Sequence, residues 1–449
     1  MTTAIILAGG ESSRLRPLGD KSLQRFLGKS LLRRHLETLI DIGIDTVVVV
    51  TNPHNAGLMR FECAAAPPGV EVRFVMQPES IGMGDAVARA LTAVTSNEQI
   101  YLTQTHDLLD PVFHRRALQM ALEYPEAVLI AARHVESYFP GGYIIPSESD
   151  VALTEQPFRV RGLIEKPGVG HEPSAWVTLV AHIIPAADEL ATALQHTANG
   201  DAGDHYERAL TMLMERRTML AMPHLARSAS LKYPWHMLDI MDLLLSRLTE
   251  TVISPTAQIA EGASIRGPVI IEGGVRLFPG ASVIGPAYID AGTILGNHAL
   301  VRESMVGARS IIGYSTEVAR SWIGDNVWFH TNYIGDSVID NNVSFGSGSV
   351  TGNLRIDEGM IKVNVKDERV PTGRNKLGQI VGSGTRIGIN TSLMPGIVIG
   401  RDAFVGPGVV LSQDVPDTRR VTLRQELDWG DNTVIRRPED RDMFRQKLS

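Results

Sequence analysis

Two glycines, an arginine and a lysine follow the first apolar stretch of the chain and together could bind a phosphate group. Residues 3–7 are predicted to form a buried strand, and Gly9 and Gly10 then let the backbone turn tightly and approach a ligand. Successive backbone N–H groups in such a turn form a concavity that suits phosphate oxygens. Arg14 and Lys21 add positive charge nearby. A glycine pair after a strand is often only a turn, but the four residues in this order favour phosphate binding.

Polar residues that could complete such a site follow later in the chain. Gln77 ends a predicted strand, and its amide offers one acceptor and two donors, enough to read the edge of a nucleobase. Gly82 lets a ligand approach the backbone closely. Asp107 ends another predicted strand, and a carboxylate suits Mg²⁺, which prefers oxygen ligands. A glutamine in a loop is ordinary by itself, so only the order of these residues along the chain indicates a binding site.

The order of these elements resembles the sugar-1-phosphate nucleotidylyltransferase family. The glycine stretch matches its L-A-G-G-x-x-[ST]-R-L-x-P-L signature, which a lysine and a G-K pair follow, and residues 77–86 match its Q-x-x-x-x-G element. Residues 141–143 and 165–167 are similar to its Y-G and E-K-P sugar-binding elements. The resemblance implies a uridylyl- or thymidylyltransferase type of enzyme that uses UTP or dTTP, a sugar 1-phosphate and Mg²⁺.

The same resemblance implies a role for each matching residue. Arg14 and Lys21 would act in catalysis by stabilising the triphosphate, and Asp107 would hold Mg²⁺. The implied nucleotide-binding residues are Leu7, Gly9, Gly10, Gln77 and Gly82. The implied sugar-phosphate-binding residues in this half of the chain are Gly142, Glu165 and Lys166.

Two positions depart from the family pattern. The family's second metal ligand is an aspartate just before a D-L-L helix, but His236 stands at that position here, and Asp239 is the nearest carboxylate. Asp239 is therefore the second candidate Mg²⁺ ligand, because imidazole is a poor ligand for this ion. The glycine of the strand that closes the sugar pocket is not evident in residues 177–182. These departures leave an alternative open, in which the domain senses a nucleotide or sugar phosphate without turnover.

Apolar periodicity predicts the elements that must position these residues. Continuous apolar runs predict strands at residues 3–7, 46–51, 70–76, 99–103 and 127–132. Helical spacing predicts helices at residues 31–42, 85–94 and 115–123. This alternation predicts an α/β domain over residues 1–250, with a doubly wound, Rossmann-like, mostly parallel sheet and helices on both faces. Ligands bind beyond the carboxyl ends of such strands, so one crevice should collect the glycine turn, Gln77 and Asp107.

The second half of the chain carries an aliphatic residue every six positions. These residues are Ile253, Ile259, Ile265, Ile271, Leu277, Val283, Ile289, Leu295 and Val301, and then Val381, Ile387, Leu393, Ile399, Val405 and Leu411. The period predicts a parallel β-helix in which each face of a coil contributes one inward side chain. We expect this domain at residues 251–416 and a polar extension at residues 417–449. The repeat is similar to that of left-handed β-helix proteins, which implies left-handed coils and a homotrimer, or a multiple of it, with sites between subunits.

Polar stretches interrupt this rhythm at residues 329–337, 345–355 and 364–378. Their order closely resembles the acetyltransferase half of GlmU-type enzymes, especially the archaeal-type bifunctional nucleotidylyltransferase–acetyltransferases. The resemblance implies acetyl-CoA as co-substrate and His330 as the catalytic base that deprotonates the amine of glucosamine 1-phosphate or galactosamine 1-phosphate. The implied sugar-phosphate ligands are Tyr333, Asn353, Lys366 and Lys376. Without this activity, the β-helix would serve only to assemble the protein.

Composition limits the class of protein further. A chain of 449 residues has room for two or three domains. Its net charge of −7 argues against a general nucleic-acid-binding protein. The single cysteine, Cys63, rules out an internal disulfide and a cysteine-built metal cluster. The sequence shows no signal-peptide pattern and no apolar run of about 18 residues, so we expect a cytoplasmic protein without a membrane partner.

Overall fold

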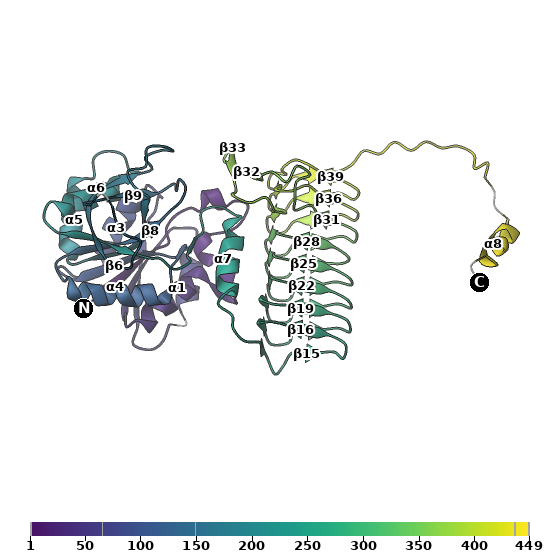
Figure 1. Ribbon diagram of the computed structural model, residues 1–449, viewed down its shortest axis with the longest axis horizontal. Coiled ribbons are helices and arrows are strands. Elements are labelled where there is room, and N and C mark those ends of the chain that lie inside the picture. Colours follow the sequence, from purple (N-terminus) through teal and green to yellow (C-terminus); the bar gives the residue numbers. More distant parts are fainter. Residues whose placement is uncertain (1, 65, 149, 435–436, 448–449) are drawn as a thin grey trace.

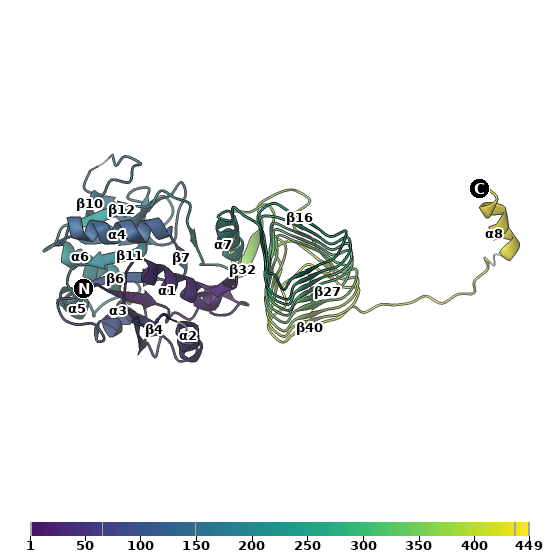
Figure 2. The same ribbon diagram turned by 90° about the horizontal axis from the view of Figure 1, so that it is seen from below.

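The computed structural model describes residues 2–64, 66–148, 150–434 and 437–447. An α/β domain packs against one side of a triangular prism of short strands, and the residues after the prism extend away from both (Figures 1 and 2). Within the described residues, none of the helices has the length and apolar character needed to span a membrane.

A mixed sheet of nine strands forms the centre of the N-terminal domain, in the order β5-β4-β1-β6-β11-β8-β12-β10-β9. Its strands are β1 (Thr2–Leu7), β4 (Thr46–Thr51), β5 (Glu71–Met76), β6 (Gln99–Gln104), β8 (Val128–His134), β9 (Gly142–Pro146), β10 (Phe158–Glu165), β11 (Trp176–Ile184) and β12 (Met219–Pro223). Two short antiparallel pairs flank it, namely β2 (Arg25–Phe26) with β3 (Lys29–Ser30), and β7 (Asp107–Leu108) with β13 (Ala229–Ser230).

The direction of the strands differs from the expectation. Strands β5, β4, β1 and β6 are parallel, but β11 runs antiparallel between β6 and β8. The five expected strands are confirmed, whereas the sheet is mixed rather than mostly parallel. The apolar pattern shows which residues are buried, but a strand can run in either direction with the same pattern, so the reversal at β11 leaves no mark in the periodicity.

The helices of this domain are α1 (Leu31–Asp41), α2 (Ala56–Cys63), α3 (Met83–Leu91), α4 (Pro111–Glu123), α5 (Ala187–His196), α6 (His205–Met214) and α7 (His236–Leu245). Ser30 caps α1 by accepting a hydrogen bond from the backbone N–H of Arg33, and Asp110 caps α4 in the same way. The three helices expected from the sequence are thus confirmed, with ends that differ by a few residues.

Alternate residues of β1 build two hydrophobic cores. Ile5 and Leu7 pack with α3, α5 and α6 on one face of the sheet. Ala4 and Ile6 pack with α1, α2 and α4 on the other face. The helices therefore cover both faces of the sheet, as the sequence predicts.

Three parallel sheets form the prism. The docking sheet, which faces the N-terminal domain, contains β14 (Val252–Ile253), β17 (Val269–Ile271), β20 (Ala287–Ile289), β23 (Met305–Val306), β26 (Trp322–Ile323), β29 (Val338–Ile339), β34 (Ile380–Val381) and β37 (Val398–Ile399). The second sheet contains β15 (Gln258–Ile259), β18 (Arg276–Leu277), β21 (Ile294–Leu295), β24 (Ile311–Ile312), β27 (Trp328–Phe329), β30 (Ser344–Phe345), β35 (Arg386–Ile387), β38 (Phe404–Val405) and β40 (Arg420–Val421). The third sheet contains β16 (Ser264–Arg266), β19 (Ser282–Ile284), β22 (Leu300–Arg302), β25 (Glu317–Ala319), β28 (Tyr333–Gly335), β31 (Val350–Thr351), β36 (Ser392–Leu393) and β39 (Val410–Leu411).

The repeated aliphatic residues fill the inside of the prism, which confirms the predicted β-helix. The coils also continue through the stretch where the six-residue rhythm is lost. Their inward residues there follow one another at steps of five or six positions: Val306, Ile312, Val318, Ile323, Phe329, Ile334, Ile339 and Phe345. A shorter corner between two strands therefore breaks the period in the sequence without breaking the stack of coils.

The docking sheet buries its outward face against the N-terminal domain. Side chains of α7 share a hydrophobic core with Tyr288, Met305 and Trp322 of this sheet. The indole N–H of Trp322 donates a hydrogen bond of 2.9 Å to the carbonyl oxygen of Arg25. Arg401 donates to the carbonyl oxygens of Pro17 and Leu18 at 2.6 and 2.5 Å. These polar contacts reach the segment that follows the glycine turn, so the prism supports that segment directly.

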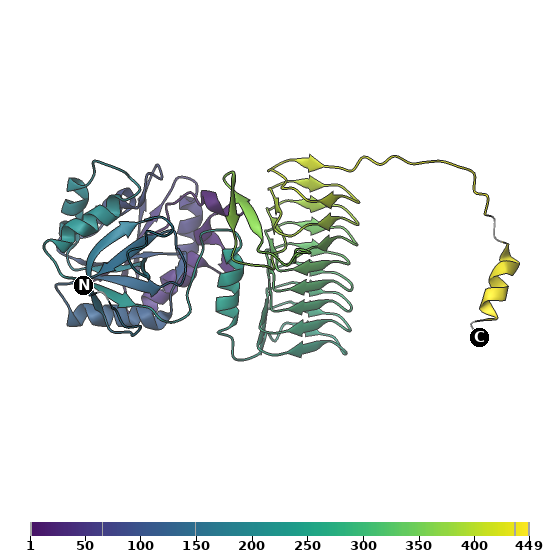
Figure 3. The same cartoon turned by 45° about the horizontal axis from the view of Figure 1, so that its top comes forward.

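A hairpin and a tail complete the C-terminal half. The hairpin β32 (Lys362–Val365) and β33 (Glu368–Pro371) leaves the prism between β31 and β34 and lies beside α7 (Figure 3). After the hairpin, Arg374 forms an ion pair with Asp239 of α7 at 2.5 Å. Beyond β40 the chain is extended, and α8 (Pro438–Arg445) lies away from the rest of the molecule (Figure 1).

Replacing Phe345 with alanine is expected to destabilise the prism by about 3–5 kcal/mol. Its ring is fully buried and lies 5.3 Å from the ring of Phe329, so the substitution leaves a cavity that the coils cannot close. Urea unfolding followed by circular dichroism measures the loss. Ser344→Ala, on the outward side of the same strand, is the matched control and should change stability by less than about 0.5 kcal/mol. Equal effects of the two changes would contradict the assigned inward register.

Candidate active sites

A cleft of about 380 Å³ opens beyond the carboxyl ends of the N-terminal strands. It collects eleven of the residues singled out in the sequence: Leu7, Gly9, Gly10, Arg14, Lys21, Gln77, Gly82, Asp107, Gly142, Glu165 and Lys166. The expectation that one crevice gathers the glycine turn, the glutamine and the aspartate is therefore confirmed.

The glycine turn is held in place from behind by two buried asparagines. Asn52 donates a hydrogen bond to the carbonyl oxygen of Gly9 at 3.1 Å, and Asn55 donates to that of Ala8 at 2.9 Å. A Cβ atom on Gly9 would lie 2.9 Å from the amide oxygen of Gln77, so any side chain there would displace this group. Neither asparagine is predictable from the sequence, because polar residues after a strand such as β4 are typical of an ordinary turn.

Burial perturbs the charged groups at the centre of the cleft. It lowers the pKa of Lys21 to about 8, although Asp107 and Asp20 partly oppose this shift. The Lys21 ammonium lies 3.5 Å from His106 Nε2, and burial together with this ammonium lowers the pKa of His106, so the imidazole is neutral. Burial alone would raise the pKa of Asp107, but nearby positive charge, including that of Lys232, lowers it overall. Asp107 therefore carries a negative charge.

The groups around Asp107 fit a magnesium ion that substrate phosphates help to bind. Asp107 Oδ1 is buried and has no hydrogen-bond partner in the described structure, so this oxygen is available to bind a metal ion. No cluster of three histidine, cysteine, aspartate or glutamate residues suited to a metal occurs among the described residues. Mg²⁺ commonly uses one or two carboxylates plus phosphate oxygens, so a single carboxylate is compatible with this ion.

His236, at the position of the family's second metal ligand, and Asp239, the nearest carboxylate, face different groups. His236 begins α7, and its Nδ1 is 2.9 Å from the carbonyl oxygen of Ser230. Asp239 is not among the residues that line the cleft, because its carboxylate turns toward Arg374 instead. The role of Asp239 as a metal ligand stays a prediction.

The opposite wall of the cleft could bind a sugar. A Cβ atom on Gly142 would lie 2.9 Å from Thr178 Cγ2, so glycine leaves room beside this strand. Glu165 and Lys166 form an ion pair of 2.6 Å. Burial raises the pKa of Glu207 to about 7, and Glu165 adds to this shift.

The strand in which the sequence analysis found no glycine contributes a histidine to this wall. His182 of β11 lies 3.0 Å from Thr178 Oγ1 and 2.9 Å from the hydroxyl of Tyr206. Burial lowers the pKa of His182 to about 4, so it is neutral and shares hydrogen bonds with two hydroxyl groups. The sequence signal was present as a histidine within a mostly apolar strand.

Lys232 also lines the cleft and was not singled out in the sequence. Its ammonium lies 3.5 Å from the centre of the Phe139 ring and donates a hydrogen bond of 3.1 Å to the carbonyl oxygen of Pro140. Burial lowers its pKa to about 7, against the opposing effect of Asp107. A lone lysine before an aromatic residue and a proline carries no recognisable motif.

The second candidate site lies on the prism. Asn353 donates hydrogen bonds to the hydroxyl of Tyr333 at 3.3 Å and to Asp336 at 2.5 Å. Asp336 in turn forms two hydrogen bonds with Arg320. The structure therefore brings Tyr333 and Asn353 together and adds Arg320 and Asp336, which no sequence motif indicates. His330 is exposed at the edge between the second and third sheets.

The two lysines of the polar loop occupy another edge of the prism. Lys376 forms a β-bridge with Leu354, next to Asn353. Lys366 lies at the tip of the hairpin, at the edge between the third sheet and the docking sheet. Within one chain, His330 and Lys366 therefore lie at different edges.

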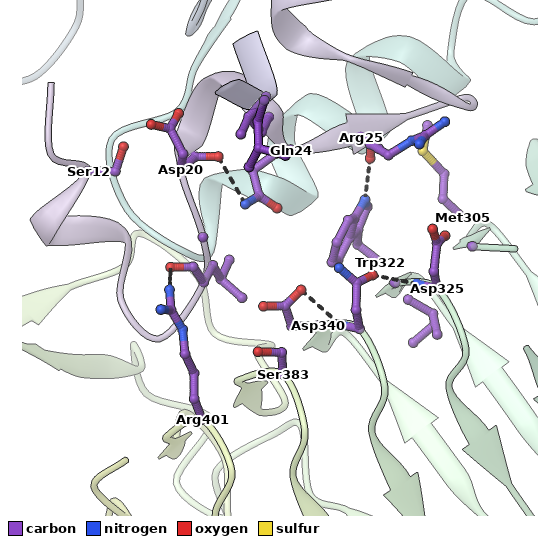
Figure 4. Close-up of a pocket in the computed structure, with 18 of the residues that line it drawn as sticks. Ser12, Asp20, Gln24, Arg25, Met305, Trp322, Asp325, Asp340, Ser383 and Arg401 are labelled. Carbon is purple, nitrogen blue, oxygen red and sulfur yellow. Dashed lines mark hydrogen bonds between the residues drawn. The ribbon is translucent and has the colours of Figure 1, made fainter. Parts of the chain in front are cut away.

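A larger cavity of about 830 Å³ lies between the two domains, behind the glycine turn (Figure 4). The residues labelled in that view come from both domains: Ser12, Asp20, Gln24, Arg25, Met305, Trp322, Asp325, Asp340, Ser383 and Arg401. It is distinct from the cleft, because none of these ten residues lines the cleft.

Comparison with known families agrees with this architecture. Residues 4–208 match the model of the MobA-like NTP transferase domain. Residues 380–413 match the bacterial transferase hexapeptide repeat. The chain joins a MobA-like NTP transferase domain to hexapeptide repeats. The cleft belongs to the NTP transferase domain, and the prism is the hexapeptide-repeat domain.

Two archaeal relatives resemble the chain over most of its length. The bifunctional protein GlmU of Methanocaldococcus jannaschii is 28% identical and is matched over 94% of this chain and 98% of its own. The bifunctional sugar-1-phosphate nucleotidylyltransferase/acetyltransferase of Sulfurisphaera tokodaii is 27% identical and is matched over 92% of this chain and 98% of its own.

Other similarities cover the NTP transferase domain alone. The catalytic subunit beta of mannose-1-phosphate guanylyltransferase from Drosophila melanogaster is 28% identical over 37% of this chain and 44% of its own. A UDP-glucose pyrophosphorylase bound to UDP-glucose superposes with a TM-score of 0.48 at 15% identity, over 55% of this chain and 99% of that one.

Proposed function

We propose that the protein is a bifunctional enzyme of nucleotide-sugar synthesis. The cleft would join a nucleoside triphosphate, UTP or dTTP, to a sugar 1-phosphate with release of pyrophosphate. The prism would transfer an acetyl group from acetyl-CoA to the amine of an amino-sugar 1-phosphate. The observation that carries the proposal is the gathering of Arg14, Lys21, Asp107 and Lys166 in one cleft, together with full-length similarity to two relatives with bifunctional names.

Nucleotidyl transfer requires positioning and charge neutralisation more than covalent catalysis. Arg14 and Lys21 would bind the triphosphate, and Gln77 would contact the base through its amide oxygen, because its NH₂ group already donates to Gly82 and Asp85. Asp107 would hold Mg²⁺, which supplies additional positive charge to the phosphates. A phosphate oxygen of the sugar 1-phosphate then attacks the α-phosphorus, and pyrophosphate leaves.

Acetyl transfer requires a base for the sugar amine. His330 would accept the amine proton as the nitrogen attacks the thioester carbon of acetyl-CoA, and the thiolate would leave. Tyr333 and Asn353 would bind polar groups of the sugar phosphate. We further propose a homotrimer in which Lys366 or Lys376 of a neighbouring copy completes the site, because the two edges of a single prism are apart.

A sensor without turnover is the second candidate function. It is motivated by His236, which replaces a carboxylate, and by Asp239, which faces Arg374 rather than the cleft. Replacement of His236 with aspartate separates the two functions. If the His236→Asp variant is more active than the wild type, the sensor is favoured. If the variant is less active, the enzyme is favoured.

Pyrophosphate release tests the nucleotidyltransferase directly. UTP and dTTP are each paired with glucose 1-phosphate and N-acetylglucosamine 1-phosphate, at high Mg²⁺ concentration. We expect turnover with at least one pair. Tight nucleotide binding without turnover of any pair would favour the sensor and contradict the enzyme.

Nucleotidyl transfer is expected to slow as the pH rises through about 8. Burial lowers the pKa of Lys21 to about 8 and that of Lys232 to about 7, so both lose their positive charge over this range. A neutral lysine binds phosphate more weakly, and kcat/KM reports the ionisation of the free enzyme. Lys21→Arg keeps its charge throughout and should make the decline shallower. An identical profile for the variant and the wild type would contradict the role of Lys21.

A further inference from the structure

Lys232 occupies a fixed position beside the carboxylate of the cleft. It follows β13, in which Ser230 pairs with Asp107 of β7. The backbone nitrogen of Lys232 lies 3.2 Å from His236 Nδ1, at the start of α7. Because both neighbours belong to ordered elements, the side chain leaves the backbone at a defined place between α7 and Asp107.

The environment of its ammonium suits an anionic ligand. The group lies over the Phe139 ring and donates to the carbonyl oxygen of Pro140. In the part of the chain that the structure describes, this carbonyl is its hydrogen-bond acceptor, and an ammonium has three donors. A buried charge is stabilised when an oppositely charged group pairs with it. The cleft therefore presents a lysine whose remaining donors are available to an anion.

The position of the Lys232 ammonium indicates which anion it would bind. A Cβ atom on Gly141 would lie 3.6 Å from Lys232 Nζ, so the ammonium adjoins the loop that leads into Gly142. Gly142, Glu165 and Lys166 form the sugar wall of the cleft. The glycine turn, where the triphosphate is expected, has its own ammonium in Lys21. Lys232 is thus placed between Asp107 and the sugar wall, where the two substrates must meet.

We infer that Lys232 is a further catalytic residue, which binds the phosphate of the sugar 1-phosphate; this inference rests on the proposed nucleotidyl transfer. An oxygen of this phosphate forms the new bond to the α-phosphorus. The bond from the α-phosphorus to its bridging oxygen breaks, and pyrophosphate takes the electron pair. Lys232 donates hydrogen bonds during this step and transfers no proton. When protonated, it compensates for the negative charge of the attacking phosphate beside Asp107.

Binding without turnover tests this assignment. Titration calorimetry with glucose 1-phosphate and N-acetylglucosamine 1-phosphate, in EDTA and without nucleotide, excludes contributions from metal and chemistry. Lys232→Met should raise the Kd for the sugar phosphate by about 10- to 100-fold, because a charge-assisted hydrogen bond is lost. Lys232→Arg should recover part of the affinity, while the Kd for UTP should change little in either variant.

Arg133→Met is the matched control. Arg133 lies 4.6 Å from the centre of the same Phe139 ring but is not among the residues that line the cleft. It should therefore leave the Kd for the sugar phosphate unchanged, and thermal melting shows whether each variant folds. Equal weakening in Arg133→Met would assign the effect to Phe139 and overturn the inference.

Two other results would also overturn it: an unchanged Kd for the sugar phosphate in Lys232→Met, or no binding of either sugar phosphate by the wild type. A wild type that binds sugar phosphate through Lys232 but releases no pyrophosphate would contradict only the proposed nucleotidyl transfer. The two failures are distinguishable because the binding measurement needs no nucleotide.

Discussion

Replacing His330 with alanine is expected to lower thiol release from acetyl-CoA by about 10²–10⁴-fold, the usual loss when a general base is removed. The imidazole is exposed at the edge between the second and third sheets, where a sugar amine can reach it. Glucosamine 1-phosphate and galactosamine 1-phosphate are the substrates to assay. Pyrophosphate release in the same preparation should stay at the wild-type rate, because the cleft lies in the other domain.

His298 provides a control for this experiment. It is an exposed histidine at the same edge of the prism, two coils earlier, between β21 and β22. His298→Ala should leave thiol release unchanged. If the two substitutions have equal effects, or if the wild type releases no thiol with either amino sugar, the acetyltransferase proposal is wrong. The prism would then serve in assembly alone.

Asp107→Asn is expected to lower pyrophosphate release by about 10²–10³-fold, similar to the loss of one preorganised electrostatic contact in other enzymes. The side chain keeps its shape but loses the negative charge and one of the two oxygens that could bind Mg²⁺. Raising the Mg²⁺ concentration should recover part of the rate. Thiol release should not change.

The control for Asp107 lies at the other end of the sheet. Asp45 is exposed and precedes β4, at the amino ends of the strands. Asp45→Asn should keep the full rate and the same Mg²⁺ dependence. A full rate in Asp107→Asn would show that nucleotidyl transfer does not depend on this carboxylate.

The prism could be predicted from the sequence because each inward position carries its own signal. Every coil places an aliphatic residue inside, so one shortened corner shifts the period but does not hide the neighbouring coils. The cleft was predictable for a related reason. The backbone conformations and charges that phosphates need restrict the residue types within a short stretch, as at Gly9 and Lys21.

The docking of the domains has a signal in the sequence. Strands of the docking sheet carry apolar residues on their outward side as well, such as Tyr288, Met305 and Trp322. An outward apolar row predicts a covered face. Lys232 and the two asparagines behind the glycine turn gave no comparable signal, because single polar residues become part of a site only through contacts between distant segments.

The covered face of the prism determines how the two proposed reactions would communicate. The docking sheet faces the cleft domain, so the edge that carries His330 is the one opposite, where the other two sheets meet (Figure 2). An acetylated sugar phosphate formed there cannot pass through the packed interior of the prism. It must diffuse through bulk water to reach a cleft on the same chain. Within one chain, the two steps would therefore be coupled by the concentration of this intermediate rather than by channelling, and the same compound supplied from outside would compete equally.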